Sequence, residues 1–220
     1  MLEFLRSWQR ERGRVIVFSG IFDPIHNGHM SVAKSALEHE ASLIVFLPER
    51  QSYRTLKTDV KHRTKTGCSP YEQRLAMLKI ATAKQPNFLV LESPYDHHTI
   101  KDTLSWIKTE FPKGQNFGLI FGADVAEHFW QWPNVESLSD YGVDLVIFAD
   151  RETDSIFNID RYKKSIPNVK VKTMRADNSH ISSTLIRQNV KIRSDAMSEG
   201  VYDYILRNHL YDSDDSSAEK

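Results

Sequence analysis

Short apolar segments alternate with stretches of helical periodicity along most of this chain, and that alternation restricts its fold more than any other feature. The apolar segments are residues 15–18, 43–47, 88–91, 117–121 and 143–148. Most are apolar nearly throughout, which is typical of strands covered on both faces. Helical periods fall at residues 28–40, 70–84, 100–110 and 124–129. The pattern predicts an α/β protein with a doubly wound parallel sheet and crossover helices.

The last third of the chain continues the pattern less regularly. We expect a sixth strand at residues 168–172 and two helices at 182–189 and 199–208. No repeat, long linker or change of composition divides the sequence, so the prediction is a single domain over residues 1–211. Residues 212–220 contain four acids and one lysine and few apolar groups, which predicts a disordered tail.

The composition excludes several classes of protein. The 29 Lys and Arg residues balance 29 Asp and Glu residues, and this zero net charge argues against a nucleic-acid-binding protein. Cys68 is the only cysteine, which excludes an internal disulfide and a cysteine-rich metal site. No apolar run is long enough for a membrane span, and the acidic residues near the N-terminus are unlike a signal peptide. We therefore expect a cytoplasmic protein without membrane partners; the sequence is compatible with a homo-oligomer.

The loop after the first predicted strand has the features of a phosphate-binding site. It reads S-G-I-F-D-P-I-H-N-G-H at residues 19–29 and leads directly into the first predicted helix. Gly20 allows a tight turn and close approach of a ligand. His26 and His29 stand at a helix N-terminus, where free backbone N–H groups and the helix dipole favour anions, and Gly28 adds no bulk between them.

Two other interpretations of the histidine pair are a helix cap and half of a zinc site. Zinc requires about three or four ligands. The other histidines, including the adjacent His97 and His98, offer no partner motif of suitable spacing. We therefore predict no metal ion bound by the protein alone.

This loop resembles the G-x-F-D-P-x-H-x-G-H signature of the nucleotidylyltransferase superfamily. Residues 181–187, I-S-S-T-L-I-R, resemble its I-S-S-T-x-I-R motif. The chain is short for a class I tRNA synthetase and contains no K-M-S-K-S-like segment. Within the superfamily it is similar to the bacterial-type nicotinate or nicotinamide mononucleotide adenylyltransferases over about residues 14–211. The resemblance implies a Rossmann-like fold and transfer of AMP from ATP to the 5′-phosphate of a pyridine mononucleotide, with release of pyrophosphate.

The resemblance also implies roles for individual residues. The expected catalytic residues are His26, His29 and Arg187. The expected ATP-binding residues are Gly20, Ile21, Phe22, Gly28, Ser182, Ser183, Thr184 and Arg151. The expected residues for the mononucleotide are Thr99, Gly122, Asp124, Trp132 and Lys57. Independently of the resemblance, Ser182 and Ser183 can cap a helix that carries Arg187 one turn along, where a guanidinium suits a polyphosphate.

Other segments leave alternatives open. Residues 99–104, T-I-K-D-T-L, resemble a family stretch at the pyridine, and G-A-D at 122–124 precedes Trp132, the expected stacking residue. Core packing is the alternative role for Trp132 and for Trp130. Residues 50–65 carry six basic side chains against one acid and lack the family's P-P-H-K-like segment. They form either a solvated loop or a phosphate-binding loop in which Lys57, Lys61 or Lys65 substitutes.

The implied chemistry needs no general base, because the attacking phosphate oxygen is already ionised at pH 7. Positioning two anions and neutralising charge suffice. We expect Mg²⁺ as the cofactor, held mainly by the ATP phosphates and water, with Asp23 either assisting or serving only as a turn residue. Backbone N–H groups near Thr99 and Ala123 favour an anionic ring substituent, which predicts a preference for nicotinate mononucleotide. The alternatives are another nucleotidylyltransferase, such as a phosphopantetheine adenylyltransferase, and a non-catalytic nucleotide-binding protein.

Overall fold

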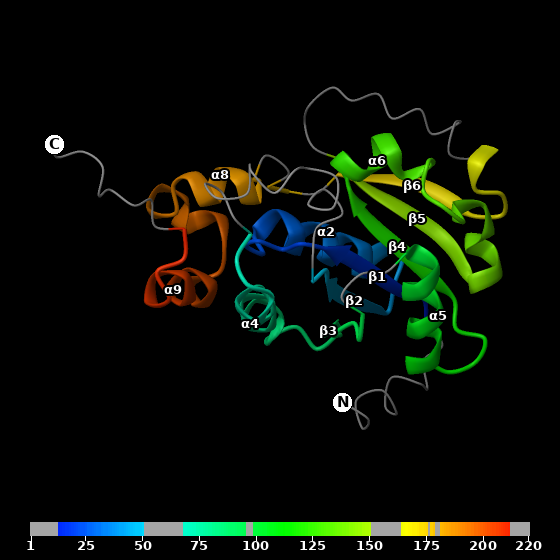
Figure 1. Cartoon of the computed structure of the whole chain (residues 1–220), viewed down its shortest axis with the longest axis horizontal. Helices are drawn as coiled ribbons and strands as arrows, with labels where there is room; N and C mark the ends of the chain where they lie inside the picture. Colours follow the sequence, from blue (N-terminus) through cyan, green and yellow to red (C-terminus); the bar gives the residue numbers. More distant parts are fainter. Residues whose placement is uncertain are drawn as a thin grey trace, which may run out of the picture.

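Six parallel strands form one sheet in the order β3-β2-β1-β4-β5-β6 (Figure 1). The computed structural model describes residues 13–50, 68–95, 99–150, 164–175, 177–178 and 181–211. The strands are β1 Val15–Gly20, β2 Leu43–Pro48, β3 Phe88–Val90, β4 Phe117–Gly122, β5 Val143–Asp150 and β6 Lys170–Arg175. The predicted doubly wound parallel sheet is confirmed, and each of the six predicted strands is present within about two residues of its expected start.

Helices cover both faces of the sheet (Figure 1). One face carries α2 Asn27–His39, α4 Tyr71–Thr82, α8 Ser183–Gln188 and α9 Glu199–Arg207. The other carries α5 Ile100–Glu110, α6 Ala123–Phe129 and the 3₁₀ helix η2 Val135–Tyr141. A second 3₁₀ helix, η3 Lys191–Ala196, connects α8 to α9. The six predicted helices are present, whereas the two 3₁₀ helices were not predicted because such short turns lack an extended apolar period.

The two cores explain why the strands are apolar nearly throughout. In β1, Val15 and Val17 belong to the core beneath α5 and α6, while Ile16 and Phe18 belong to the core beneath α2 and α4. Side chains alternate between the faces of a strand, so a strand covered on both faces has no polar positions to expose. These four β1 side chains are 0–4% exposed.

The strand order changes direction at β1. β1 pairs with β2 on one side and with β4 on the other, both in parallel. The chain first adds β2 and β3 on one side of β1 and then adds β4, β5 and β6 on the other side. The loops that follow β1 and β4 therefore lead away from each other at the carboxyl ends of these two strands. Ligands of open α/β sheets bind at such a switch point.

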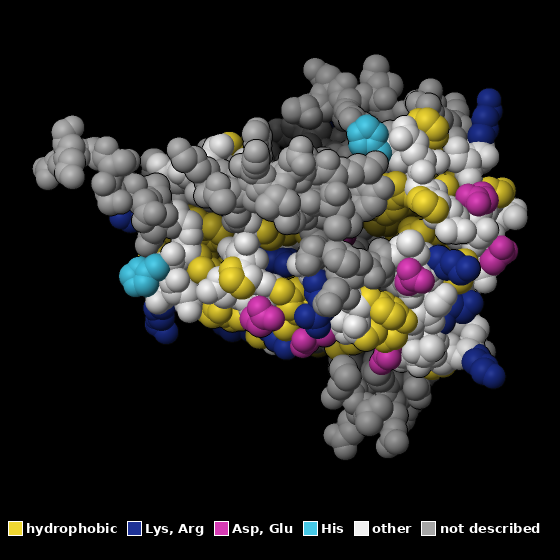
Figure 2. All heavy atoms as spheres, viewed as in Figure 1, with side chains coloured by type: hydrophobic (Ala, Val, Ile, Leu, Met, Phe, Trp, Pro, Cys, Tyr) yellow, Lys and Arg dark blue, Asp and Glu magenta, His cyan; other side chains and the backbone are white. Residues whose placement is uncertain are grey.

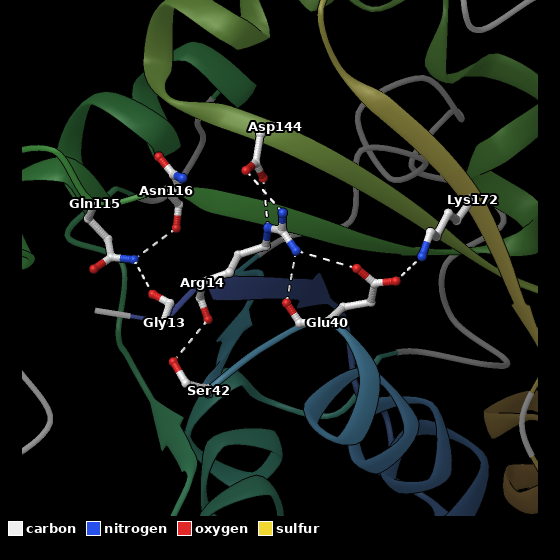
Figure 3. A network of polar contacts seen from close by, with 8 residues as sticks. All are labelled: Gly13, Arg14, Glu40, Ser42, Gln115, Asn116, Asp144 and Lys172. Atoms are coloured by element: carbon white, nitrogen blue, oxygen red, sulfur yellow. Dashed lines mark hydrogen bonds and ion pairs between the residues drawn. The ribbon is translucent and has the colours of Figure 1, made fainter. Parts of the chain in front are cut away.

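Near the amino-terminal ends of the strands, a polar network surrounds Arg14 (Figure 3). The Arg14 guanidinium donates from Nε and Nη2 to the two Asp144 carboxylate oxygens at 2.7 and 3.0 Å. It also donates from Nη1 to the Glu40 carbonyl at 2.9 Å, and the Glu40 carboxylate pairs with Lys172. These contacts join the residue before β1 to β5, β6 and the C-terminal end of α2. They lie at the opposite end of β1 from the loop that contains His26.

The surface has a mixed charge on the face shown in Figure 2, where Lys and Arg side chains are interspersed with Asp and Glu side chains. This mixture agrees with the zero net charge of the chain. Within the described ranges, none of the helices has the length and apolar character needed to cross a membrane. The predicted acidic tail, residues 212–220, lies outside the described residues.

Candidate active site

His26 and His29 form a reciprocal cap at the start of α2. His26 is the N-cap residue; its Nδ1 accepts a hydrogen bond from the His29 backbone N–H at 3.4 Å. The His29 Nδ1 accepts from the His26 backbone N–H at 3.3 Å, and the ring centroids are 3.7 Å apart. In the neutral imidazoles this pattern puts the proton on Nε2, so each ring has an Nε2–H donor, and that of His26 is buried. The helix-capping role considered in the sequence analysis is therefore present, and these hydrogen bonds orient both rings.

Tight packing holds the histidine pair in place. Phe22 has a φ of 51° and is 2% exposed; its ring packs edge-on against the His29 ring at 5.2 Å. A Cβ atom at Gly28 would lie 3.0 Å from the His26 ring and 2.9 Å from the Asn178 carbonyl oxygen. The His26 ring thus requires glycine at position 28.

Helix α8 is bonded to the same loop. The Arg187 Nη1 donates to the Asp23 carbonyl at 2.6 Å, and its Nη2 donates to Thr184 Oγ1 at 3.3 Å. Ser183 Oγ donates to the Pro24 carbonyl at 3.0 Å, while Ser182 caps the helix by accepting from Leu185. The loop after β1 and helix α8 therefore place the three predicted catalytic residues, His26, His29 and Arg187, near the carboxyl end of β1.

Asp23 links three segments of the chain. Its carboxylate is 2% exposed. Oδ1 accepts from the Tyr211 hydroxyl at 2.6 Å, and Oδ2 accepts from the Ser69 backbone N–H at 3.0 Å. With both oxygens engaged, Asp23 has the structural role weighed from the sequence and is poorly placed to assist Mg²⁺. Over the described ranges, no group of three or more His, Cys, Asp or Glu side chains is arranged to hold a metal ion.

Arg74 is a buried clamp that the sequence analysis did not single out as a site residue. It is 1% exposed. Its Nη1 donates to the carbonyls of Ile21 and Glu49 at 2.6 and 2.8 Å, Nη2 donates to that of Arg50 at 3.0 Å, and Nε donates to that of Ser69 at 2.9 Å. The guanidinium thereby joins the loops after β1 and β2 to the residues before α4. The sequence did contain a sign of this role, because Arg74 lies on the apolar face of α4 and a buried charge requires hydrogen-bond partners.

The loops after β1 and β2 are also joined directly through their backbones. The Glu49 N–H donates to the Gly20 carbonyl at 2.9 Å, and the Ser19 hydroxyl donates to the Glu49 carboxylate at 3.1 Å. Two predicted ATP-binding residues, Gly20 and Ile21, thus contribute carbonyl groups to the framework of the site. Their contribution to ATP binding stays a prediction.

The described residues predicted to bind the pyridine lie in the segments that follow β3 and β4 along the chain. Thr99 caps α5: its backbone N–H donates to Asp102 Oδ2 at 3.0 Å, and its Oγ1 accepts from the Asp102 N–H at 3.2 Å. The sequence argument assigned an N–H near Thr99 to the ring substituent of the substrate. Thr99's own N–H is bonded to Asp102, because the stretch T-I-K-D contains a complete capping box.

Trp132 has the packing role considered as the alternative in the sequence analysis, and its stacking on the pyridine stays a prediction. Its ring packs edge-on against Phe121 at 5.5 Å and beside Phe129 at 5.4 Å, yet it is only partly buried. Gly122 caps the start of α6, which contains Asp124. Lys57 and Arg151 lie outside the described residues, as do His97, His98 and the basic segment beyond Arg50.

Cys68 lies beside the Asp23 carboxylate. Burial, and then the charge of Asp23, raise the pKa of the Cys68 thiol to about 11. The thiol is therefore protonated near neutral pH, and it lacks the thiolate character of a catalytic nucleophile. A covalent cysteine mechanism is not supported by this environment.

Comparison with known proteins places the chain among nucleotide-transferring enzymes. The cytidylyltransferase-like family model matches residues 17–189. A relative from Clavibacter michiganensis, named "Probable nicotinate-nucleotide adenylyltransferase", is 30% identical over 210 residues, 92% of this chain and 96% of its own. A protein of the same name from Saccharopolyspora erythraea is 29% identical over 215 residues, 94% of this chain and 93% of its own.

Solved structures show the same fold. The nicotinic acid mononucleotide adenylyltransferase of Plasmodium falciparum complexed with NaAD superimposes with a TM-score of 0.67 at 18% identity. The match covers 90% of this chain and 97% of that one. The same enzyme complexed with APC gives a TM-score of 0.65 at 19% identity and the same coverage.

Proposed function

Because this chain belongs to the nicotinate-nucleotide adenylyltransferases of the cytidylyltransferase-like family, we propose that it transfers the adenylyl group of ATP to nicotinate mononucleotide. The products are nicotinate adenine dinucleotide and pyrophosphate, in NAD biosynthesis. Sequence similarity along almost the whole chain supports this activity. The observation that carries it to this chain is the His26–His29 pair, held at the start of α2 beside Arg187.

The reaction is an in-line displacement at the α-phosphorus of ATP. A 5′-phosphate oxygen of the mononucleotide forms the new P–O bond, and the bond from the α-phosphorus to the bridging oxygen of the β-phosphate breaks. No proton has to be removed from the nucleophile. The Nε2–H groups of His26 and His29 and the Arg187 guanidinium stabilise the charge that develops on the phosphate oxygens.

Mg²⁺ is the proposed cofactor and would supply charge neutralisation on the triphosphate. The ATP phosphates and water are its proposed ligands, since Mg²⁺ usually keeps several waters. The Asp23 carboxylate is a poor candidate, because both of its oxygens already accept hydrogen bonds. We propose that the enzyme acts in the cytoplasm, where its free thiol at Cys68 remains reduced.

The preference for nicotinate over nicotinamide is supported by the names of the relatives and not by the Thr99 backbone. Trp132, partly buried against Phe121, offers a flat surface to either pyridine ring. The alternative of a phosphopantetheine adenylyltransferase is disfavoured, because the curated relatives that match this chain over 92–94% of its length act on the nicotinate nucleotide by name.

A pyrophosphate-release assay tests the proposal. The full chain is supplied with Mg²⁺, ATP and one acceptor at a time: nicotinate mononucleotide, nicotinamide mononucleotide or phosphopantetheine. We expect the highest kcat/KM with nicotinate mononucleotide and loss of turnover in His29→Ala. Activity with phosphopantetheine alone would overturn the substrate assignment, and no turnover with any acceptor would favour a non-catalytic nucleotide-binding protein.

A further inference from the structure

We infer that Tyr211 is a positioning residue for adenylyl transfer: its hydroxyl keeps the Asp23 carboxylate turned away from Arg187, which leaves that guanidinium available to the polyphosphate. The inference deepens the proposed function and rests on it. It concerns the tyrosine that is the last of the described residues.

The backbone carbonyl and the side-chain carboxylate of Asp23 have different hydrogen-bond partners. Its backbone carbonyl accepts from Arg187 Nη1 at 2.6 Å. Its carboxylate instead accepts from the Tyr211 hydroxyl at 2.6 Å and from the Ser69 N–H at 3.0 Å. Arg187 therefore meets the neutral carbonyl of Asp23, and not the negative charge of the same residue.

Arg187 is close enough for its charge to act on this cluster. The guanidinium lowers the pKa of the Tyr211 hydroxyl and of the Cys68 thiol as a minor contribution, against the larger effects of burial and of Asp23. A carboxylate that loses a hydrogen bond at 2% exposure has little access to water, so it turns toward nearby donors, which include the Cys68 thiol as well as Arg187. Arg187 is the cation already bonded to the same residue, and an arginine–carboxylate pair is a strong interaction.

Tyr211 is suited to this role because it stays protonated. Burial, and then the charge and hydrogen bond of Asp23, raise the pKa of its hydroxyl far above its usual value. The hydroxyl is thus a neutral donor throughout the physiological range of pH. It adds no charge that would compete with ATP.

The position of Tyr211 is fixed by the last helix. Helix α9 packs against α4, with Gly200 facing Ile80, and Val201 and Ile205 of α9 are fully buried. Tyr211 follows α9 and packs against the same core as α2 and α4. Tyr211 is therefore anchored through α9 and this core, so its hydroxyl can hold Asp23 at a set position.

The test compares Tyr211→Phe with Tyr204→Phe. The first variant removes the hydroxyl that bonds Asp23; the second removes a hydroxyl in α9 for which no hydrogen bond to another described residue is found. We expect Tyr211→Phe to raise the KM for ATP and the Kd for pyrophosphate about tenfold, the equivalent of one hydrogen bond to a charged group. In Tyr211→Phe the KM for the mononucleotide should stay within about twofold of wild type. Tyr204→Phe should change neither the KM for ATP nor the Kd for pyrophosphate.

A double-mutant cycle with Asp23→Asn separates positioning from packing. Without the negative charge at position 23, Tyr211→Phe should have less than about a twofold further effect on ATP binding. If Asp23→Asn does not fold, Arg187→Gln is used instead, and Tyr211→Phe should again add nothing to the loss of ATP binding. An equal tenfold effect in the wild-type and substituted backgrounds would overturn the inference.

Two further results would also decide against it. A lower midpoint of thermal unfolding in Tyr211→Phe, with an unchanged KM for ATP, would mean that the hydroxyl has only a structural role. An unchanged Kd for pyrophosphate in Tyr211→Phe would refute the link to Arg187. Pyrophosphate binding is measured by calorimetry without turnover, so this arm stands even if the wild-type chain fails to transfer an adenylyl group and the proposed function is wrong.

Discussion

Replacing Arg74 by methionine should destabilise the protein more than most single substitutions. The change keeps a long apolar stem but removes four hydrogen bonds from a guanidinium that is 1% exposed. Their acceptors are the backbone carbonyls of Ile21, Glu49, Arg50 and Ser69, which would lose a charged partner together.

The magnitude follows from the burial and the number of bonds. One hydrogen bond to a charged group contributes about 1.5–3 kcal/mol, and four that share a guanidinium are not additive. Each buried carbonyl left without its partner costs about 1–3 kcal/mol, and four that share one guanidinium cost less than their sum, so we expect a loss of about 3–5 kcal/mol in the free energy of unfolding for Arg74→Met. Such a loss is a large part of a typical total of about 5–15 kcal/mol. It corresponds to a drop of about 6–20 °C in the midpoint of thermal unfolding.

Urea denaturation followed by circular dichroism measures the loss directly. Arg74→Lys keeps the charge but has a single nitrogen, so it should recover only part of the stability. Arg207→Met is the matched control, because Arg207 is exposed in α9 and its side chain has no hydrogen bond or ion pair with another residue that the structure describes. A loss below about 1 kcal/mol in Arg74→Met, or an equal loss in Arg207→Met, would refute the view of Arg74 as the clamp of the site.

The other predictions concern the histidine loop and the thiol beside it. His29→Ala should lower kcat by about 10²–10³ and change the KM for ATP much less, because a donor at the transferring phosphate stabilises the transition state most; near-normal turnover would refute this role. Gly28→Ala should lower kcat by about 10²-fold, because the new Cβ crowds the His26 ring and the Asn178 carbonyl, whereas Gly200→Ala, whose Cβ meets only the γ2 methyl of Ile80 in α4, should keep wild-type turnover. Alkylation of Cys68 by iodoacetamide should be slow at pH 7.5 and still rise between pH 9 and 11, because a pKa raised to about 11 delays thiolate formation; a rate that levels off near pH 9 would contradict that value.

The secondary structure was largely determined by local sequence. The predicted helix at residues 100–110 coincides with α5, and the ends of the other predicted strands and helices differ from the structure by at most three residues. Each element has an apolar period that depends on neighbours a few residues away. The sixth strand was placed less accurately, since β6 is an edge strand with exposed positions and has a weaker pattern.

The loop of the candidate site was also recognisable before the structure, because its chemistry is concentrated in short segments. The stretch from Gly20 to His29 contains a glycine turn, two imidazoles and a helix start in consecutive residues. The capping box of Thr99 and Asp102 is equally local. Its consequence for the Thr99 N–H was overlooked because the same donor also suited a ligand.

Tertiary structure alone decided which polar groups meet. Asp23 and Tyr211 are 188 residues apart, and Arg74 reaches carbonyls 24, 25 and 53 residues away. A hydrogen bond between distant segments leaves no period or spacing in the sequence. It depends on the strand order, which sets the loops after β1 and β2 side by side, and on α9, which brings Tyr211 to the first loop. The sequence by itself determined the elements and the reactive loop, whereas the supports of that loop arise only when the sheet and its helices assemble.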